Sequence, residues 1–150
     1  MKKLPILSAL LFFFTLIPQA FGQNNNLVPG KEKFHLNKAG EEEIGYTQAV
    51  KVGNTIYVSG SVGWGKMQDA LKLAYDEIDK SLKSYNATFE NIVKENLYTT
   101  ALDSVIQYKD VRRAYYGTDF PAATWVEVKR LYNPDIVVEI EVIAVLPEKK

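Results

Sequence analysis

The chain contains no cysteine and a single histidine, His35, among its 150 residues. The lack of cysteine excludes disulfides and thiol chemistry. A single histidine disfavours a histidine-based metal site and a Ser-His-Asp triad. We therefore expect the domain to be stabilised by an apolar core, with self-association as a second contribution.

The chain also has no excess of charge of either sign, with 18 basic and 18 acidic residues. Nothing in this balance provides a basic face that would attract nucleic acid. We expect no nucleic-acid partner.

The N-terminus carries the pattern of a secretory signal. Lys2 and Lys3 precede the apolar stretch 4–17, Pro18 ends it, and the segment 20–22 (Ala-Phe-Gly) places small residues where signal peptidase reads. The apolar stretch is short for a membrane span, which needs about 20 residues. The alternative is an uncleaved membrane anchor. We expect export to the periplasm or beyond, with no membrane attachment after cleavage.

The predicted organisation is a signal peptide (1–22), a flexible lead-in (23–30), one domain (31–147) and a short tail (148–150). Cleavage after Gly22 would leave 128 residues, a suitable length for a single domain. Loss of Lys2 and Lys3 would leave 16 basic and 18 acidic residues, a net charge of −2.

Short β-rich runs and two amphipathic segments predict the elements. The first helix is expected over 67–85, where apolar residues recur at steps of three and four, and the second runs from Asp103 or Ser104 through Tyr116. Segments 37–45 and 60–66 are polar or glycine-rich and are predicted to be loops. Strands are expected over 31–36, 47–52, 55–59, 92–100, 123–128 and 136–146.

The order β-β-β-α-β-α-β-β predicts an α/β (α+β) two-layer sandwich, one sheet with both helices on one face. The last strand is long and rich in valine and isoleucine, so we expect it in the centre of the sheet. The other face of the sheet would then remain apolar and open, which favours self-association.

Four segments in order now carry a family pattern: 45–50 (GYTQAV), 58–60 (VSG), 121–128 (PAATWVEV) and 138–145 (VEIEVIAV). Together they resemble the RidA family, also called YjgF or endoribonuclease L-PSP proteins. The resemblance implies a chorismate-mutase-like fold with a mixed sheet, and a homotrimer with a small-molecule pocket at each subunit interface. It also implies cofactor-free, metal-free hydrolysis of enamines and imines such as 2-iminopropanoate and 2-iminobutanoate.

Several positions match the family's site. Glu139 stands where the family has the glutamate that positions the attacking water, and a carboxylate can orient and deprotonate such a water. Tyr46 matches a tyrosine at the pocket rim, and Ser59 with Gly60 matches the turn that lines the pocket floor. For Glu139 an interface hydrogen bond is the other interpretation, and Glu141 points to the same face.

Other positions depart from the family. Ala123 stands where active members have the arginine that grips the substrate carboxylate, and a methyl group offers no such fork. Trp125 shares a strand face with Ala123, where the family has a small residue, and would either fill pocket space or pack at an interface. Asp103 replaces a frequent asparagine and would repel a carboxylate.

Two more features concern the same pocket. Trp64, in the loop after Gly60, would either lid the pocket or cap the trimer. Four cations are candidates to replace the missing arginine at Ala123. Arg112 and Arg113 are expected to be solvated on the second helix, Arg130 follows a strand end, and Lys66 lies in the glycine-rich loop. Replacement by one of them is the alternative to a site without a carboxylate grip.

Three hypotheses remain. The first is an exported trimer that binds a neutral, aromatic or cationic small molecule, or none, and is not a standard iminoacid deaminase. The second is an imine or enamine hydrolase that acts on an atypical substrate without a carboxylate, with Glu139 positioning water. The third is a structural module or a nuclease. The sequence shows neither the cluster of metal ligands nor the stripe of basic residues that a nuclease would need.

Overall fold

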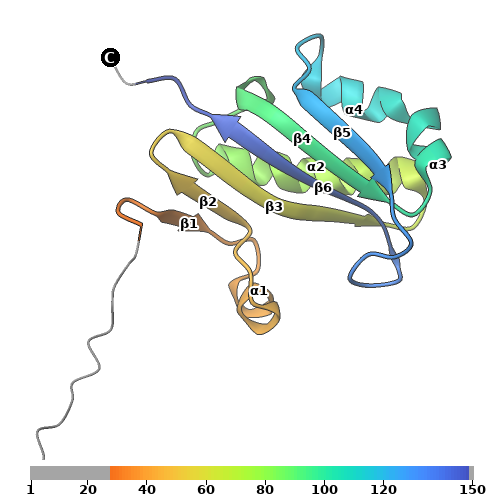
Figure 1. Cartoon of the computed structure of the whole chain (residues 1–150), viewed down its shortest axis with the longest axis horizontal. Helices are drawn as coiled ribbons and strands as arrows, with labels where there is room; N and C mark the ends of the chain where they lie inside the picture. The colour runs from red at the N-terminus through yellow and green to blue at the C-terminus, as the bar shows by residue number, and fades with distance from the viewer. Residues whose placement is uncertain (1–27, 149–150) are drawn as a thin grey trace, which may run out of the picture.

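Six strands form one mixed sheet in the computed structural model, which describes residues 28–148. Their order across the sheet is β1-β2-β3-β6-β4-β5, and all neighbours run antiparallel except β4 and β5. The strands are β1 (Glu32–Phe34), β2 (Ala49–Val52), β3 (Thr55–Trp64), β4 (Ile92–Thr99), β5 (Ala122–Glu127) and β6 (Ile136–Val145). The predicted central place of the last strand is confirmed (Figure 1).

The main helices lie together on one face of the sheet (Figure 1), as the fold class predicts. They are α2 (Met67–Lys83), α3 (Leu102–Gln107) and α4 (Lys109–Tyr116), while η1 (Phe89–Asn91) is a short 3-10 turn before β4. The apolar stripe of α2, from Met67 to Leu82, is buried against β3 and β6. The α/β two-layer architecture is thus confirmed.

Three local predictions were wrong. The segment 37–45 contains helix α1 (Lys38–Ile44), which starts where the Asn37 side chain accepts a hydrogen bond from the Gly40 amide at 3.3 Å. Strand β3 continues to Trp64 through the glycine-rich stretch, because pairing with β6 goes on past two register shifts. The second predicted helix is two helices, α3 and α4, separated at Tyr108.

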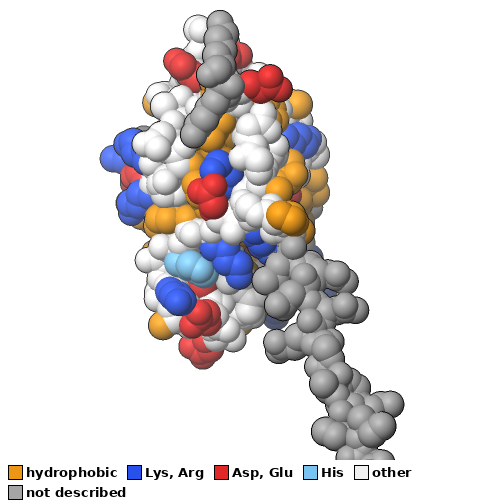
Figure 2. All heavy atoms as spheres, turned by 90° about the vertical axis from the view of Figure 1, so that its left-hand side faces the viewer, with side chains coloured by type: hydrophobic (Ala, Val, Ile, Leu, Met, Phe, Trp, Pro, Cys, Tyr) orange, Lys and Arg blue, Asp and Glu red, His pale blue; other side chains and the backbone are white. Residues whose placement is uncertain are grey.

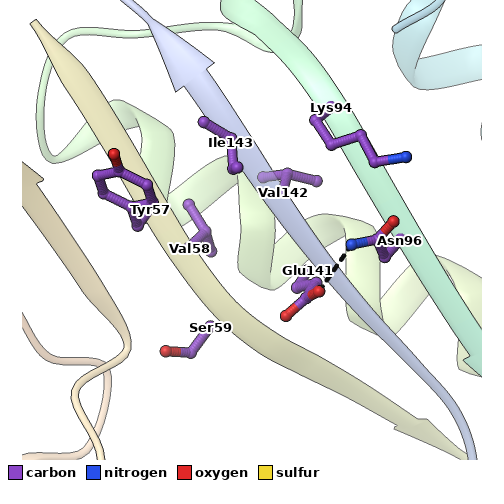
Figure 3. A pocket seen from close by; sticks show the side chains of 8 residues that line it. All are labelled: Tyr57, Val58, Ser59, Lys94, Asn96, Glu141, Val142 and Ile143. Carbon is purple, nitrogen blue, oxygen red and sulfur yellow. Dashed lines mark hydrogen bonds between the residues drawn. The ribbon is translucent and has the colours of Figure 1, made fainter. Parts of the chain in front are cut away.

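Strand β6 separates the two faces of the sheet. Ile136, Val138, Ile140, Val142 and Ala144 are buried beneath the helices, and the alternate residues point to the other face. On that face Glu141 accepts hydrogen bonds from Asn96 (2.8 Å) and Tyr98 (3.2 Å), beside a pocket of about 230 Å³ (Figure 3). The open face is therefore mixed in polarity rather than apolar.

The predicted signal peptide (1–22), most of the predicted lead-in and the last two residues lie outside the described residues. Among residues 28–148, no helix is both long and apolar enough to cross a membrane. The face shown in Figure 2 mixes side chains of both charges and has no broad patch of one sign.

Candidate functional site

A pocket of about 470 Å³ lies at the edge of β3, beyond the point where its pairing with β2 ends at Val58. Its lining comes from helix α1, the loop that follows it, the second half of β3, helix α2 and the start of β6. Four of the predicted site residues line it together: Tyr46, Ser59, Gly60 and Glu139. The fold thus brings these four residues, which were selected by a sequence match alone, into one cavity.

Glu139 fits in this pocket because its neighbour on β3 has no side chain. A β-carbon added to Gly60 would lie 1.9 Å from Oε1 of Glu139 and 2.7 Å from its Cγ. The glycine therefore leaves the volume that the glutamate side chain occupies. The sequence match predicted that Ser59 and Gly60 line the pocket floor. At position 60 the reason is steric, because any side chain there would collide with Glu139.

Glu139 is half-buried, and burial raises the pKa of its carboxyl, with the charge of Glu141 adding to the effect. Burial also raises the pKa of Glu77, on α2, against the opposing effect of the Val62 amide and Lys80. Carboxyls of this kind exchange protons closer to neutral pH than ordinary glutamates do. Glu139 and Glu77 therefore both have a raised pKa beside this pocket, and Glu77 was not anticipated from the sequence.

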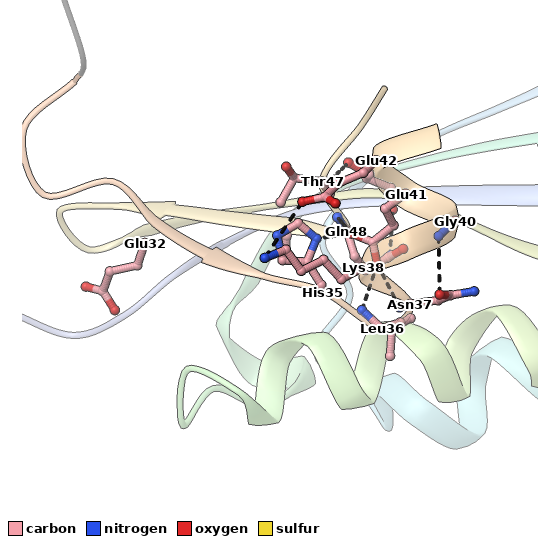
Figure 4. Close-up of polar contacts among 12 residues, drawn as sticks. Glu32, His35, Leu36, Asn37, Lys38, Gly40, Glu41, Glu42, Thr47 and Gln48 are labelled. Carbon is pink, nitrogen blue, oxygen red and sulfur yellow. Dashed lines mark hydrogen bonds and ion pairs between the residues drawn. The ribbon is translucent and has the colours of Figure 1, made fainter. Parts of the chain in front are cut away.

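Glu41 fixes the wall of the pocket on the side of α1 (Figure 4). Its carboxylate accepts hydrogen bonds from the backbone amides of Leu36 (2.8 Å), Asn37 (2.9 Å) and Gln48 (2.9 Å), and lies 2.5 Å from Nδ1 of His35. Burial alone would raise the pKa of Glu41, but these bonds together lower it. A buried carboxylate thus joins α1 to the residue that directly precedes β2.

Aromatic rings form the mouth of the pocket. Trp64, Tyr46 and Tyr132 all line it, and they are 51%, 41% and 73% exposed. Trp64 therefore lies at the pocket, the position expected if it acts as a lid. Tyr132 comes from the connection between β5 and β6 and carries no sequence signal that would have selected it.

The remaining predicted site residues do not join this pocket within one chain. Ala123 lies on β5 opposite Glu95 of β4, and Asp103 is exposed in the first turn of α3. Trp125 lies on the same strand as Ala123 and two residues on, so the two share a face, as predicted. The Trp125 indole packs toward the helices rather than into the Glu139 pocket.

A buried glutamate holds that indole in place. Nε1 of Trp125 donates to Glu95 at 3.1 Å, and Nε of Arg112 donates to the same oxygen at 2.9 Å. Tyr75 and Tyr116 donate their hydroxyls to the other oxygen at 3.1 and 2.8 Å. Burial, and then the charge of Glu95, raises the pKa of both tyrosines. Glu95 therefore accepts four hydrogen bonds in the core.

The prediction that Arg112 is solvated was wrong. Arg112 is 8% exposed, is paired with Glu95, and lies over the rings of Tyr116 (4.5 Å), Phe120 (5.3 Å) and Trp125 (5.6 Å). This is the cation packed beneath the strand that carries Ala123, and its charge is already compensated. Arg113 is exposed, as predicted.

Metal-ligating side chains do not gather in groups of three or more anywhere in residues 28–148. The candidate chemistry of the pocket is therefore best described by its carboxylates, its hydroxyls and its aromatic walls.

Comparison with known proteins identifies the family. The model of the family described as endoribonuclease L-PSP matches residues 37–146. The chain belongs to this family. A RutC family protein of Pyrococcus abyssi is 31% identical over 123 residues, covering 76% of this chain and 96% of that protein. A 2-iminobutanoate/2-iminopropanoate deaminase of Bos taurus is 33% identical over 109 residues, covering 67% and 79%.

Solved structures show the same fold. A YjgF family member from Mycobacterium tuberculosis superimposes with a TM-score of 0.72 at 26% identity, covering 77% of this chain and 99% of that one. RidA from an Antarctic Psychrobacter gives a TM-score of 0.64 at 29% identity, covering 68% and 89%. The resemblance to the RidA family is thus confirmed.

Proposed function

We propose that this RidA-family chain is an exported homotrimer with a small-molecule pocket at each subunit interface, and that it is not a standard iminoacid deaminase. The observation that carries the proposal is Ala123, at the position of the family's carboxylate-binding arginine. Arg112, the buried cation beside this strand, is paired with Glu95 through Nε, and its Nη2 atom is buried without a hydrogen-bond partner among the described residues. A guanidinium whose charge is already balanced by a buried carboxylate is a poor substitute for the family's arginine. A substrate carboxylate would lack its partner.

The arrangement of the two half-sites supports the trimer. Tyr46, Ser59, Gly60 and Glu139 line the pocket beside β3, whereas Ala123 and Trp125 lie on β5 at the far edge of the sheet. A ring of copies would set the β5 edge of one subunit against the Glu139 pocket of the next. Exposed Tyr57 and Val126 on the open sheet face would also be covered in such a ring.

The export signal supports a location outside the cytoplasm. Iminoacids released by cytoplasmic enzymes would then not reach the protein, which agrees with the loss of the arginine. Mass spectrometry of the protein recovered from the host's periplasm and medium tests this part: a chain that begins at Gln23 supports cleavage, and a chain that retains residues 1–22 opposes it.

A second candidate function is hydrolysis of an imine or enamine that has no carboxylate. The observation that favours it is Glu139, whose carboxyl has a raised pKa and lines a pocket with room for a substrate and a water. If such hydrolysis is found, Glu139→Gln should abolish most of it. Unchanged hydrolysis in that variant would exclude Glu139 as the base.

The test of the main proposal is release of ammonia from freshly generated 2-iminopropanoate, together with the mass of the assembly by light scattering. We expect a trimer and a rate no higher than that of buffer. A monomer, or a rate well above buffer, would overturn the corresponding part of the proposal.

A further inference from the structure

The walls of the Glu139 pocket combine aromatic rings with carboxylates. Three rings line it, those of Tyr46, Trp64 and Tyr132, and so do the carboxylates of Glu41, Glu77 and Glu139. Among the described residues, 28–148, no lysine, arginine or histidine lines this pocket. Within one chain the cavity is therefore acidic and aromatic at once.

The charges of two of these carboxylates are available to a ligand. Glu41 is engaged by three backbone amides and His35, so its oxygens already have partners. Glu139 has the negative charge of Glu141 as its main electrostatic neighbour, and Glu77 receives limited support from Lys80 and the Val62 amide. A cation in the pocket would offset both charges, whereas an anion would meet repulsion.

The negative charges of the three carboxylates all act on the hydroxyl of Tyr46. Burial raises the pKa of the Tyr46 hydroxyl, and the charges of Glu41, Glu77 and Glu139 each raise it further. Their negative potential therefore converges where the tyrosine lines the cavity. One of the three aromatic rings of the pocket therefore lies within the negative potential of the carboxylates.

The rings add an attraction of their own. Trp64 and Tyr132 are each at least half exposed, so their rings are accessible to a ligand in the pocket. The negative face of an aromatic ring attracts a cation with about 0.5–2 kcal/mol, and tryptophan is the strongest such partner. A neutral apolar ligand would gain from the rings but would leave the carboxylates without a partner.

We infer that the Glu139 pocket binds a small organic cation, of the class of protonated amines and quaternary ammonium ions. The inference rests on the proposed function in that it names the ligand class of the same pocket. It explains why a chain with Ala123 in place of the arginine retains Tyr46, Gly60 and Glu139: the acidic half of the site serves a ligand that needs no carboxylate grip.

The experiment is calorimetric titration of the purified protein with three probes of nearly equal shape. They are choline, the neutral isostere 3,3-dimethylbutan-1-ol, and the anion 3,3-dimethylbutanoate. We expect choline to bind at least about tenfold more tightly than the alcohol, and the anion to bind most weakly. An alcohol that binds as tightly as choline, an anion that binds best, or no heat with any probe would overturn the inference.

Variants locate the binding. Glu139→Gln and Trp64→Leu should each weaken choline about fivefold or more, and Glu139→Gln should leave the alcohol unchanged. Glu90→Gln, which removes an exposed carboxylate outside the pocket, is the matched control and should change nothing. Choline binding that survives both pocket variants would contradict the inference. Failure of the cation preference leaves the proposed function intact, whereas ammonia release from 2-iminopropanoate would overturn the proposed function whatever choline does.

Discussion

Gly60 of β3 and Glu139 of β6 share a space that admits one side chain. A β-carbon at position 60 would come within 1.9 Å of Oε1 of Glu139. The atoms in the way belong to a flexible side chain, so the glutamate can turn aside while the strands remain paired. The two positions are thus coupled through the placement of the Glu139 carboxylate, and this coupling can be tested without unfolding the protein.

Gly60→Ala should therefore leave stability within about 1 kcal/mol of the parent and weaken ligand binding as much as Glu139→Gln does. Denaturant unfolding and choline titration measure the two effects. Gly63→Ala is the contrasting variant, because its β-carbon would meet the backbone oxygen of Ala70 at 2.0 Å, and backbone cannot rotate away. We expect Gly63→Ala to lose about 1–3 kcal/mol. Equal losses of stability in the two variants would contradict this account.

Glu95→Gln should destabilise the fold by about 3–5 kcal/mol, because it leaves the buried charge of Arg112 without a counter-ion. Adding Arg112→Met to the same chain should recover most of the loss, since a buried pair replaced by apolar and neutral groups is often neutral. Urea unfolding of the single and double variants gives both values. Asp110→Asn serves as control, because its contact to Arg113 is long and exposed. A double variant as unstable as the single one would refute the pairing.

Glu41→Gln should lower stability by about 2–4 kcal/mol near neutral pH, because the buried amides of Leu36, Asn37 and Gln48 lose their charged acceptor. The pKa of Glu41 is lowered in the folded state, so its contribution is present above the unfolded value of about 4.3 and is lost as pH falls through the folded value. The difference between parent and variant should therefore shrink as pH is lowered below about 5. Urea unfolding at several pH values checks this, with the exposed Glu42→Gln as control. A difference that grows toward acid would contradict the assignment.

Ala123→Arg should create or raise hydrolysis of 2-iminopropanoate, by at least about tenfold over the parent, since a charged hydrogen-bonded pair contributes roughly 1.5–3 kcal/mol. Ala123 is exposed, so the larger side chain has room. Thr124→Arg is the matched control, because it places the same group on the opposite face of β5. Ammonia release measures both. If Ala123→Arg hydrolyses 2-iminopropanoate no faster than the parent, the absence of an arginine at position 123 does not determine the activity.

The sequence predicted those features that depend on local periodicity. Helix α2 could be predicted from its apolar stripe and strand β6 from its long apolar run, without knowing which elements they pack against. Helix α1 was missed because its residues carry no apolar stripe. Glu41, which joins this helix to the residue directly before β2, lies in a run of three glutamates typical of an exposed segment. The burial of Arg112 depends on Glu95, 17 residues away, and no local pattern reveals such a pair.

The candidate site was predictable only in part. The resemblance to the family selected Tyr46, Ser59, Gly60 and Glu139, and the structure brings these four together. Glu77 and Tyr132 approach the pocket from α2 and from the β5–β6 connection, so only the fold could add them. The direction of Trp125 also depended on the fold, since its hydrogen-bond acceptor lies on a neighbouring strand.

The most direct test of the central claim is the value of kcat/KM for 2-iminopropanoate, measured by ammonia release side by side with the deaminase of Bos taurus under identical conditions. Because Ala123 offers no grip for the substrate carboxylate and Arg112 is held by Glu95, we predict no turnover by this chain above buffer, while the bovine enzyme is active. A value for this chain comparable to that of the bovine enzyme would contradict the account.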